Sequence, residues 1–166
     1  SRAGPFRSGR ATSPPAPPGA GAARDLRVWT PLLSLTLLRL AVLLLLVFFH
    51  RPAYSSGMHG SDEVGLAEAW HAEFVNHGVD VVFNGHDHDF EYLVADGVNY
   101  YVIGGGGAAL REFTKPPLPE TVYREVINHA VVVDVDEQQL SLVPYRIDGS
   151  VIEEAVLSLS APPPQP

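Results

Sequence analysis

The hydrophobic pattern of the second half of the chain predicts a series of short strands. Apolar runs bounded by Gly, Asn, Asp or Ser residues are typical of strands. Such runs occur at residues 79–83, 99–103, 130–135 and 140–145. The last two flank Asp136-Glu137-Gln138, which we interpret as a hairpin turn. The pattern therefore indicates at least two sequential strand pairs.

One stretch has helical rather than strand-like periodicity. Over residues 63–77, apolar positions recur at offsets of three and four: Leu66, Ala69, Trp70 and Phe74. This spacing predicts a helix with one apolar face, on which Trp70 is expected to be a core anchor. Asp62 and Glu63 favour its start, and Gly78 supplies a stop.

The remaining segments connect these elements. Residues 52–62 read as a loop, 89–93 as a lead out of the preceding strand, and 95–97 as a turn. Residues 147–157 give one more pairing around Asp148-Gly149. A strand, a helix and a second strand in this order predict an α/β sheet whose site lies outside the carboxyl ends of the strands. The later hairpins suggest antiparallel additions, as in layered sandwiches.

Composition divides the chain into four segments. Residues 1–28 are rich in Pro, Gly, Ala and Arg and are expected to be disordered. Residues 29–46 form an apolar segment, and residues 161–166 form a proline-rich tail. Residues 47–160 between them contain the predicted helix and most of the predicted strands and form one domain. The chain has no cysteine, which excludes disulfides and thiolate metal sites. The net charge of -8 argues against a general nucleic-acid binder.

The apolar stretch 29–49 has two interpretations. It contains ten leucines, and its length would suffice to span a bilayer in spite of Arg39. The basic residues that precede it would then face the cytoplasm. Alternatively, residues 42–49 form a fully buried strand of a sheet that is covered on both faces. The two interpretations conflict, because one segment cannot be both lipid-embedded and a core strand.

Histidines follow two of the apolar runs. His50 ends Val47-Phe48-Phe49, and Gly85-His86-Asp87-His88 follows the run at 79–84. Neutral imidazole is the commonest protein ligand of transition metals. Two strand ends that carry histidines would suit a metal-dependent hydrolase.

Three blocks in this order resemble a known family. They are His50-Arg51-Pro52-Ala53-Tyr54-Ser55-Ser56-Gly57, Gly85-His86-Asp87-His88 and Gly104-Gly105-Gly106-Gly107-Ala108. Together they resemble the C-terminal half of a calcineurin-like metallophosphoesterase, most closely the purple acid phosphatase branch. The resemblance implies the C-terminal portion of a four-layer α/β/β/α sandwich with a two-metal centre. Its two divalent or trivalent ions would be Fe, Zn or Mn and would act on a phosphate ester.

The resemblance also implies roles for four histidines. His50 and His86 would bind one ion and His88 its neighbour. His59, nine residues after His50, would contact the substrate phosphate and assist the leaving group as the catalytic residue. The other reading of His59 is a solvated loop histidine. His71, His77 and His129 are interpreted as structural.

Four further features near the motifs are less specific. Asp87 and Asp89 would either orient a ligand imidazole or be solvated loop acids. Tyr54 is expected to pack rather than to act chemically. The glycine run 104–107 is expected to let the backbone approach the pocket closely.

The family's N-terminal ligand blocks have no counterpart in the sequence. Before His50 there is one acid, Asp25, and neither an asparagine nor another histidine. We therefore expect this chain to be an incomplete, weakly active part of a phosphoesterase. Two alternatives stay open: a mononuclear zinc enzyme that uses His50, His86 and His88, and a membrane-anchored non-catalytic remnant inserted through residues 29–49.

Overall fold

The computed structural model describes residues 44–61, 65–136 and 139–160. The predicted disordered segment 1–28 and the tail 161–166 lie outside the described residues. So does most of the apolar segment 29–46. No helix within the described ranges is long and apolar enough to cross a membrane.

Two sheets contain all the named strands. The larger sheet has five strands in the order β1 (Leu46–Phe48), β2 (Val81–Asn84), β4 (Val98–Ile103), β3 (Phe90–Ala95) and β5 (Thr121–Glu125). Within it β1, β2 and β4 are parallel, whereas β3 runs antiparallel to both β4 and β5. The smaller sheet is an antiparallel set of β6 (His129–Val135), β7 (Gln139–Arg146) and β8 (Leu157–Ser160). The expected mixture of parallel and antiparallel pairing is confirmed.

Helix α2 (Leu66–His77) connects the parallel strands β1 and β2. Its end is set by Gly78, which adopts a left-handed conformation with φ 67° and donates its N–H to the carbonyls of Phe74 and Val75. The predicted glycine stop is therefore confirmed. The expected start at residue 63 falls among residues 62–64, which are outside the described part.

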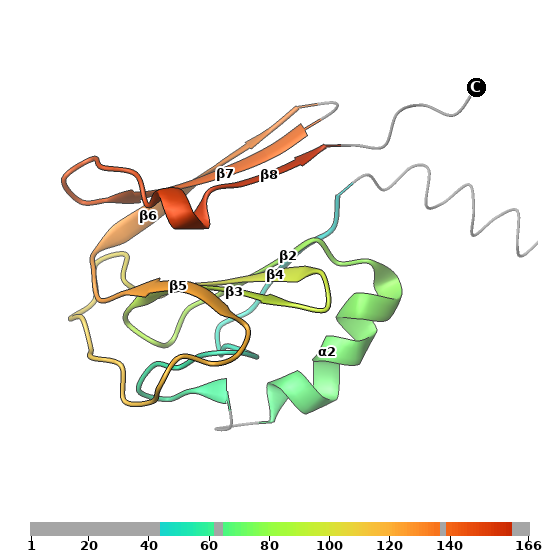
Figure 1. Ribbon diagram of the computed structural model, residues 1–166, viewed down its shortest axis with the longest axis horizontal. Helices are drawn as coiled ribbons and strands as arrows, with labels where there is room; N and C mark the ends of the chain where they lie inside the picture. The colour runs from blue at the N-terminus through green and yellow to red at the C-terminus, as the bar shows by residue number, and fades with distance from the viewer. Residues whose placement is uncertain (1–43, 62–64, 137–138, 161–166) are drawn as a thin grey trace, which may run out of the picture. The chain divides into compact units, whose positions relative to one another are not determined.

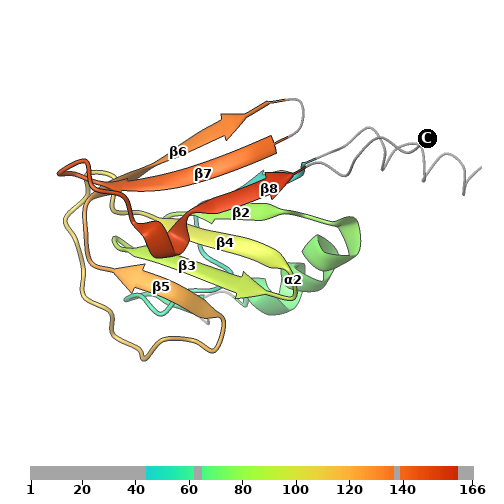
Figure 2. The same cartoon turned by 45° about the horizontal axis from the view of Figure 1, so that its top comes forward.

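The two sheets and the helix stack as layers, with α2 on one face of the larger sheet and the smaller sheet on the other (Figure 1). On the helix side Phe74 packs in a buried cluster with Val82 and Tyr100. On the other side Phe90 and Tyr101 share a buried cluster with Leu140, Leu142 and Ile152. The central strands β2, β4 and β3 are consequently buried on both faces (Figure 2). These are three layers of the expected α/β/β/α arrangement.

Two strands of the larger sheet were not predicted. Residues 90–95 form β3 instead of a lead out of the motif, and β5 lies beside it. The pattern of β3 is interrupted by Glu91, which is nevertheless fully buried. Its carboxylate accepts hydrogen bonds from the Ser56 N–H, the Ser56 hydroxyl and the Thr121 hydroxyl. A buried acid with all its partners from distant segments is invisible to a hydropathy pattern.

The predicted pairing over residues 147–157 is partly confirmed. The turn at Asp148-Gly149 forms, and a single bridge joins Tyr145 to Val151. The strand that pairs with β7 begins only at Leu157, after the short 3-10 helix η3 (Glu153–Ala155).

The β1 edge of the larger sheet is less buried than predicted. The strand over 42–49 was expected to be fully buried, but β1 covers three residues and Phe48 is 67% exposed. Trp70 is 53% exposed, so its prediction as a core anchor was wrong. Phe74, one turn further along α2, is the helix residue that is buried. The reason is that β1 is an edge strand and covers only part of the helix.

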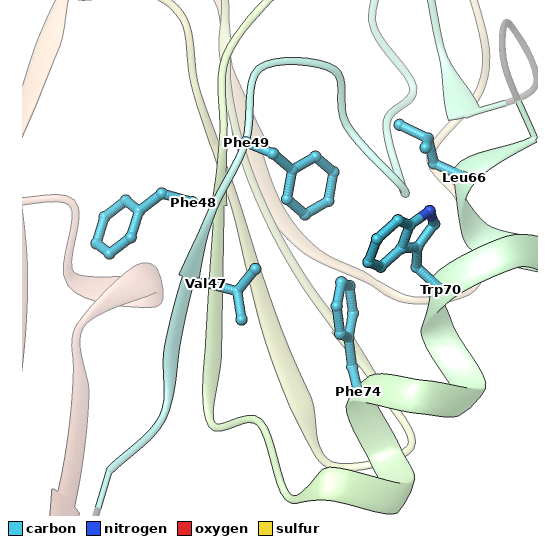
Figure 3. A pocket seen from close by; sticks show the side chains of 6 residues that line it. All are labelled: Val47, Phe48, Phe49, Leu66, Trp70 and Phe74. Carbon is cyan, nitrogen blue, oxygen red and sulfur yellow. The ribbon is translucent and has the colours of Figure 1, made fainter.

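An apolar pocket of about 380 Å³ lies between β1 and α2. Val47 and Phe49 project from the β1 segment toward Phe74 and Trp70 of the helix, whereas Phe48 points to the other face of the sheet (Figure 3). The lining residues are Val47, Phe48, Phe49, Leu66, Trp70 and Phe74. None of them is ionisable, so this pocket is separate from the predicted chemistry.

Candidate metal centre

The histidines of both motifs follow parallel strands that end at the same edge of the larger sheet. His50 lies two residues after β1, and His86 lies two residues after β2. The Gly85 N–H donates to the His50 carbonyl at 2.9 Å. The Asn84 side-chain amide donates to the Phe49 carbonyl at 3.0 Å. These two hydrogen bonds hold the backbone of one histidine segment against the other.

His50 and His86 meet through their ring nitrogens. His86 Nδ1 lies 3.0 Å from His50 Nε2, and the ring planes are nearly perpendicular. Two nitrogens that share a tetrahedral zinc ion are about 3.3 Å apart, because each Zn–N bond is about 2.05 Å long. The pair is therefore close to the spacing that one ion requires. His86 has φ 66°, a left-handed conformation that is uncommon outside glycine and is concentrated at functional sites.

The His59 ring lies against the His86 ring, tilted by 38°. Its ring centroid is 4.0 Å from that of His86. Arg111 Nη1 lies 2.8 Å from His59 Nε2. Because arginine can only donate, His59 Nε2 accepts this hydrogen bond, and the remaining ring proton belongs on Nδ1. His59 is thus integrated in the site rather than solvated on a free loop.

Asp87 supports the His59 loop. Its carboxylate is fully buried and accepts from the His59 N–H at 2.8 Å, the Gly60 N–H at 3.1 Å and the Ser55 hydroxyl at 2.5 Å. Asp87 is therefore not the solvated loop acid that was one of its two interpretations. Its hydrogen bonds go to the loop backbone, so it orients the His59 segment as a whole.

His88 is held by the backbone beyond the glycine run. Its Nδ1 lies 2.8 Å from the Ala109 carbonyl, and its own carbonyl accepts from the Arg111 N–H at 3.1 Å. A carbonyl only accepts, so Nδ1 carries the proton and Nε2 keeps its lone pair. Metal-binding histidines commonly have one ring N–H fixed by a carbonyl in this way.

The glycine run makes the close approach that was predicted. Gly104 lies directly against the Asp87 carbonyl, and a Cβ atom at this position would collide with that oxygen. At Gly105 a Cβ would collide with the Ile127 carbonyl and the His129 ring. The segment after β4 can therefore pack this closely only because residues 104 and 105 are glycines, which have no side chain.

Asp89 is a buried carboxylate of a different kind. It is fully buried, and neither oxygen has a hydrogen-bond partner among the described residues. Burial, together with the charges of Asp87 and Glu91, raises the pKa of Asp89 to about 7. It is not the solvated loop acid that was considered.

The other three histidines have contacts that agree with structural roles. His71 lies 2.8 Å from the Tyr100 hydroxyl and 3.0 Å from Asp96. His77 lies 3.4 Å from Glu73 on the same helix. His129 is buried at the start of β6, with Nδ1 on the Ile127 carbonyl. Tyr54 packs edge-on against His71 and Tyr100, as expected.

The described side chains include the kind of donor atom that a metal centre needs, imidazole nitrogen, but too few of them converge on one point. Within the described ranges, no group of three or more His, Cys, Asp or Glu side chains is arranged to hold an ion. His50 and His86 supply two converging nitrogens, and His88 has the tautomer of a ligand. Sequence reasoning missed Arg111, whose only signal was its place four residues after the glycine run.

Comparisons with known proteins agree with the fold. No family model matches the chain. The purple acid phosphatase PPD1 from yellow lupin (Lupinus luteus) seeds matches 82% of this chain with a TM-score of 0.65 and 21% identity. GAP50, the anchor in the inner membrane complex of Plasmodium, matches 71% with a TM-score of 0.60 and 17% identity. The matched region spans only 29% and 36% of those two chains. The described residues of this chain thus share the mixed α/β fold of part of each of these two proteins.

Proposed function

We propose that this chain carries part of the two-metal centre of a phosphate-ester hydrolase of the acid phosphatase type. In this proposal His50 and His86 bind one ion, His88 binds its neighbour, and His59 serves the substrate phosphate. The observation that carries it is the 3.0 Å approach of His86 Nδ1 to His50 Nε2, with the His59 ring in contact with the His86 ring. The bound ions, of Fe, Zn or Mn, would polarise the phosphate and supply a hydroxide nucleophile.

The protein's own contribution is to orient these side chains. Asp87 holds the His59 loop, and the Ala109 carbonyl fixes the His88 tautomer. Neutral imidazoles are required for binding, so acid would weaken the site. Since the described donor set is incomplete, the chain alone should bind metal weakly and hydrolyse little.

The proposal is tested by titrating the chain with Zn²⁺ and with Mn²⁺ while measuring hydrolysis of p-nitrophenyl phosphate. His86→Ala should lower metal affinity more than about tenfold, since it removes half of the histidine pair. His77→Ala is the matched control, because His77 is an exposed histidine on α2. Equal metal binding by the two variants would remove the histidine pair from the proposal. Robust turnover by the native chain with bound metal would contradict its description as incomplete.

Two alternatives have less support. A mononuclear three-histidine zinc site requires His88 beside the His50–His86 pair, and the described residues form no such group of three. A non-catalytic role is compatible with the fold, since GAP50 is described as an anchor. The metal titration separates these outcomes: tight binding of one zinc favours the first, and no binding favours the second.

A further inference from the structure

Arg111 places a positive charge at the candidate centre, beside the proposed catalytic histidine. Arg111 is half-buried and follows the glycine run. Its backbone N–H donates to the His88 carbonyl at 3.1 Å, and its guanidinium donates to His59 Nε2 at 2.8 Å. Arg111 therefore bridges the segment of a proposed ligand and the proposed catalytic histidine.

The acceptor that Arg111 uses here differs from those of Arg124 and Arg146. Arg146 is paired with the Glu125 carboxylate at 2.9 Å. Arg124 donates to the Ser56 hydroxyl and to the Lys115 carbonyl, and it lies over the Phe113 ring. At the centre, by contrast, the acceptor of Arg111 is a neutral ring nitrogen. A phosphate oxygen is a stronger acceptor for a guanidinium, because both partners of the hydrogen bond are then charged.

We propose that Arg111 binds the phosphate group of the substrate and in doing so releases His59. The inference rests on the proposed function and extends it to a residue that binds the substrate. While Arg111 donates to Nε2, that nitrogen cannot carry a proton for a leaving group. An anion that draws the guanidinium away removes this hydrogen bond from Nε2. The planar fork of arginine matches two oxygens of one phosphate.

The arginine–histidine pair is tested first without any anion. Side-chain ¹⁵N NMR of the native chain should show His59 with an unprotonated Nε2 and a protonated Nδ1. In Arg111→Gln this preference should relax toward a mixture of tautomers. An unchanged His59 spectrum in the variant would show that the pair is absent in solution, and would overturn the proposal.

Anion binding is then measured by titrating inorganic phosphate into the native chain, Arg111→Gln and Arg111→Lys. The loss of a charged hydrogen-bond donor should raise the Kd for phosphate by about tenfold to a hundredfold in Arg111→Gln. Arg111→Lys keeps the charge without the fork and should be intermediate. In the native chain, phosphate should also shift the His59 Nε2 resonance.

The matched control is Arg146→Gln, which removes the same charge from a site in the smaller sheet. It should change the Kd for phosphate less than about twofold, because Arg146 is occupied by Glu125. If Arg146→Gln unfolds, as judged by circular dichroism, Arg146→Lys replaces it. Equal phosphate affinity of the native chain and Arg111→Gln, or no phosphate binding at all, would overturn the proposal.

Metal titration of the same variants separates this inference from the proposed function. Arg111→Gln should keep the native metal affinity, whereas His86→Ala should lose it. If His86→Ala loses metal while Arg111→Gln binds phosphate normally, only the Arg111 inference fails. If His86→Ala and His77→Ala bind metal alike while Arg111→Gln loses phosphate, an anion site remains and the hydrolase proposal fails.

Discussion

Five of the described histidines form two groups that differ in what their rings contact. In the first group the ring nitrogens of His50 and His86 face each other at 3.0 Å, and the His59 ring lies against that of His86. In the second group the ring nitrogens of His71 and His129 contact a tyrosine hydroxyl, a carboxylate or a backbone carbonyl. The first group thus brings imidazoles together, as a shared ion would require, whereas the second group joins imidazoles to oxygen atoms of the fold.

The difference comes from the backbone beneath each group. His129 belongs to a strand and is packed against Phe90. The first group lies on loops, and its geometry depends on the buried Asp87 and on the close packing of Gly104. The comparison teaches that a histidine at a strand terminus is a candidate ligand only where the supporting shell directs it toward others.

The largest effect is expected from Gly104→Ala, which attacks the support of the first group. The added Cβ would collide with the Asp87 carbonyl, and neither backbone can yield freely. We expect a loss of more than about 3 kcal/mol in the free energy of unfolding, measured by urea denaturation. Gly106→Ala is the matched control, since the nearest atom to its Cβ would be 4.0 Å away. Similar losses for both variants would contradict the role assigned to Gly104.

A smaller loss is expected from Asp87→Asn, which removes the charge that binds the His59 loop. The amide of asparagine has one acceptor oxygen instead of two, so the donors that face its NH2 group lose their acceptor, at a total cost of about 2 to 3 kcal/mol. His59 should also show broadened NMR signals. Asp96→Asn is the control from the second group: Asp96 is 78% exposed, so its contact with His71 should contribute less than about 0.5 kcal/mol. An Asp87→Asn variant with the same free energy of unfolding as the native chain would show that the loop is organised by other contacts.

The smallest effect concerns the pH dependence of the second group. Burial lowers the pKa of His129, so the folded state favours its neutral form. This contribution to stability is present above the pKa of the unfolded chain, about 6.5, and is lost as the pH falls through the folded value. Between pH 7.5 and 5.5, the native chain should therefore lose more stability than His129→Asn. His77→Asn is the matched control variant, at a histidine exposed on α2. Identical slopes for the native chain and His129→Asn would show that His129 is not the group responsible.

Much of the element order could be predicted from local pattern. The helix, its glycine stop and the strands β2, β4, β6 and β7 follow from periodicity and turn residues, and the strand boundaries are shifted by at most two positions. β3 could not be predicted, because Glu91 looks like an exposed residue until Ser56 and Thr121 are brought to it. Trp70 was misassigned because periodicity defines a helix face but not how far the neighbouring strand covers it.

The candidate site divides in the same way. The family resemblance singled out His50, His59, His86 and His88, whereas an orienting role for Asp87 was one of two interpretations and Arg111 was not recognised. Their partners lie 28 and 52 residues away in the chain. No local pattern contains such contacts.

By itself the sequence determined the α/β class, the helix between two parallel strands and the placement of histidines at their ends. These depend on periodicity and on residue type, which act over a few neighbouring positions. Only the tertiary structure decided which histidines meet, which acids are buried and which cation faces the site. Those outcomes depend on contacts between distant segments, where burial makes every polar group require a partner.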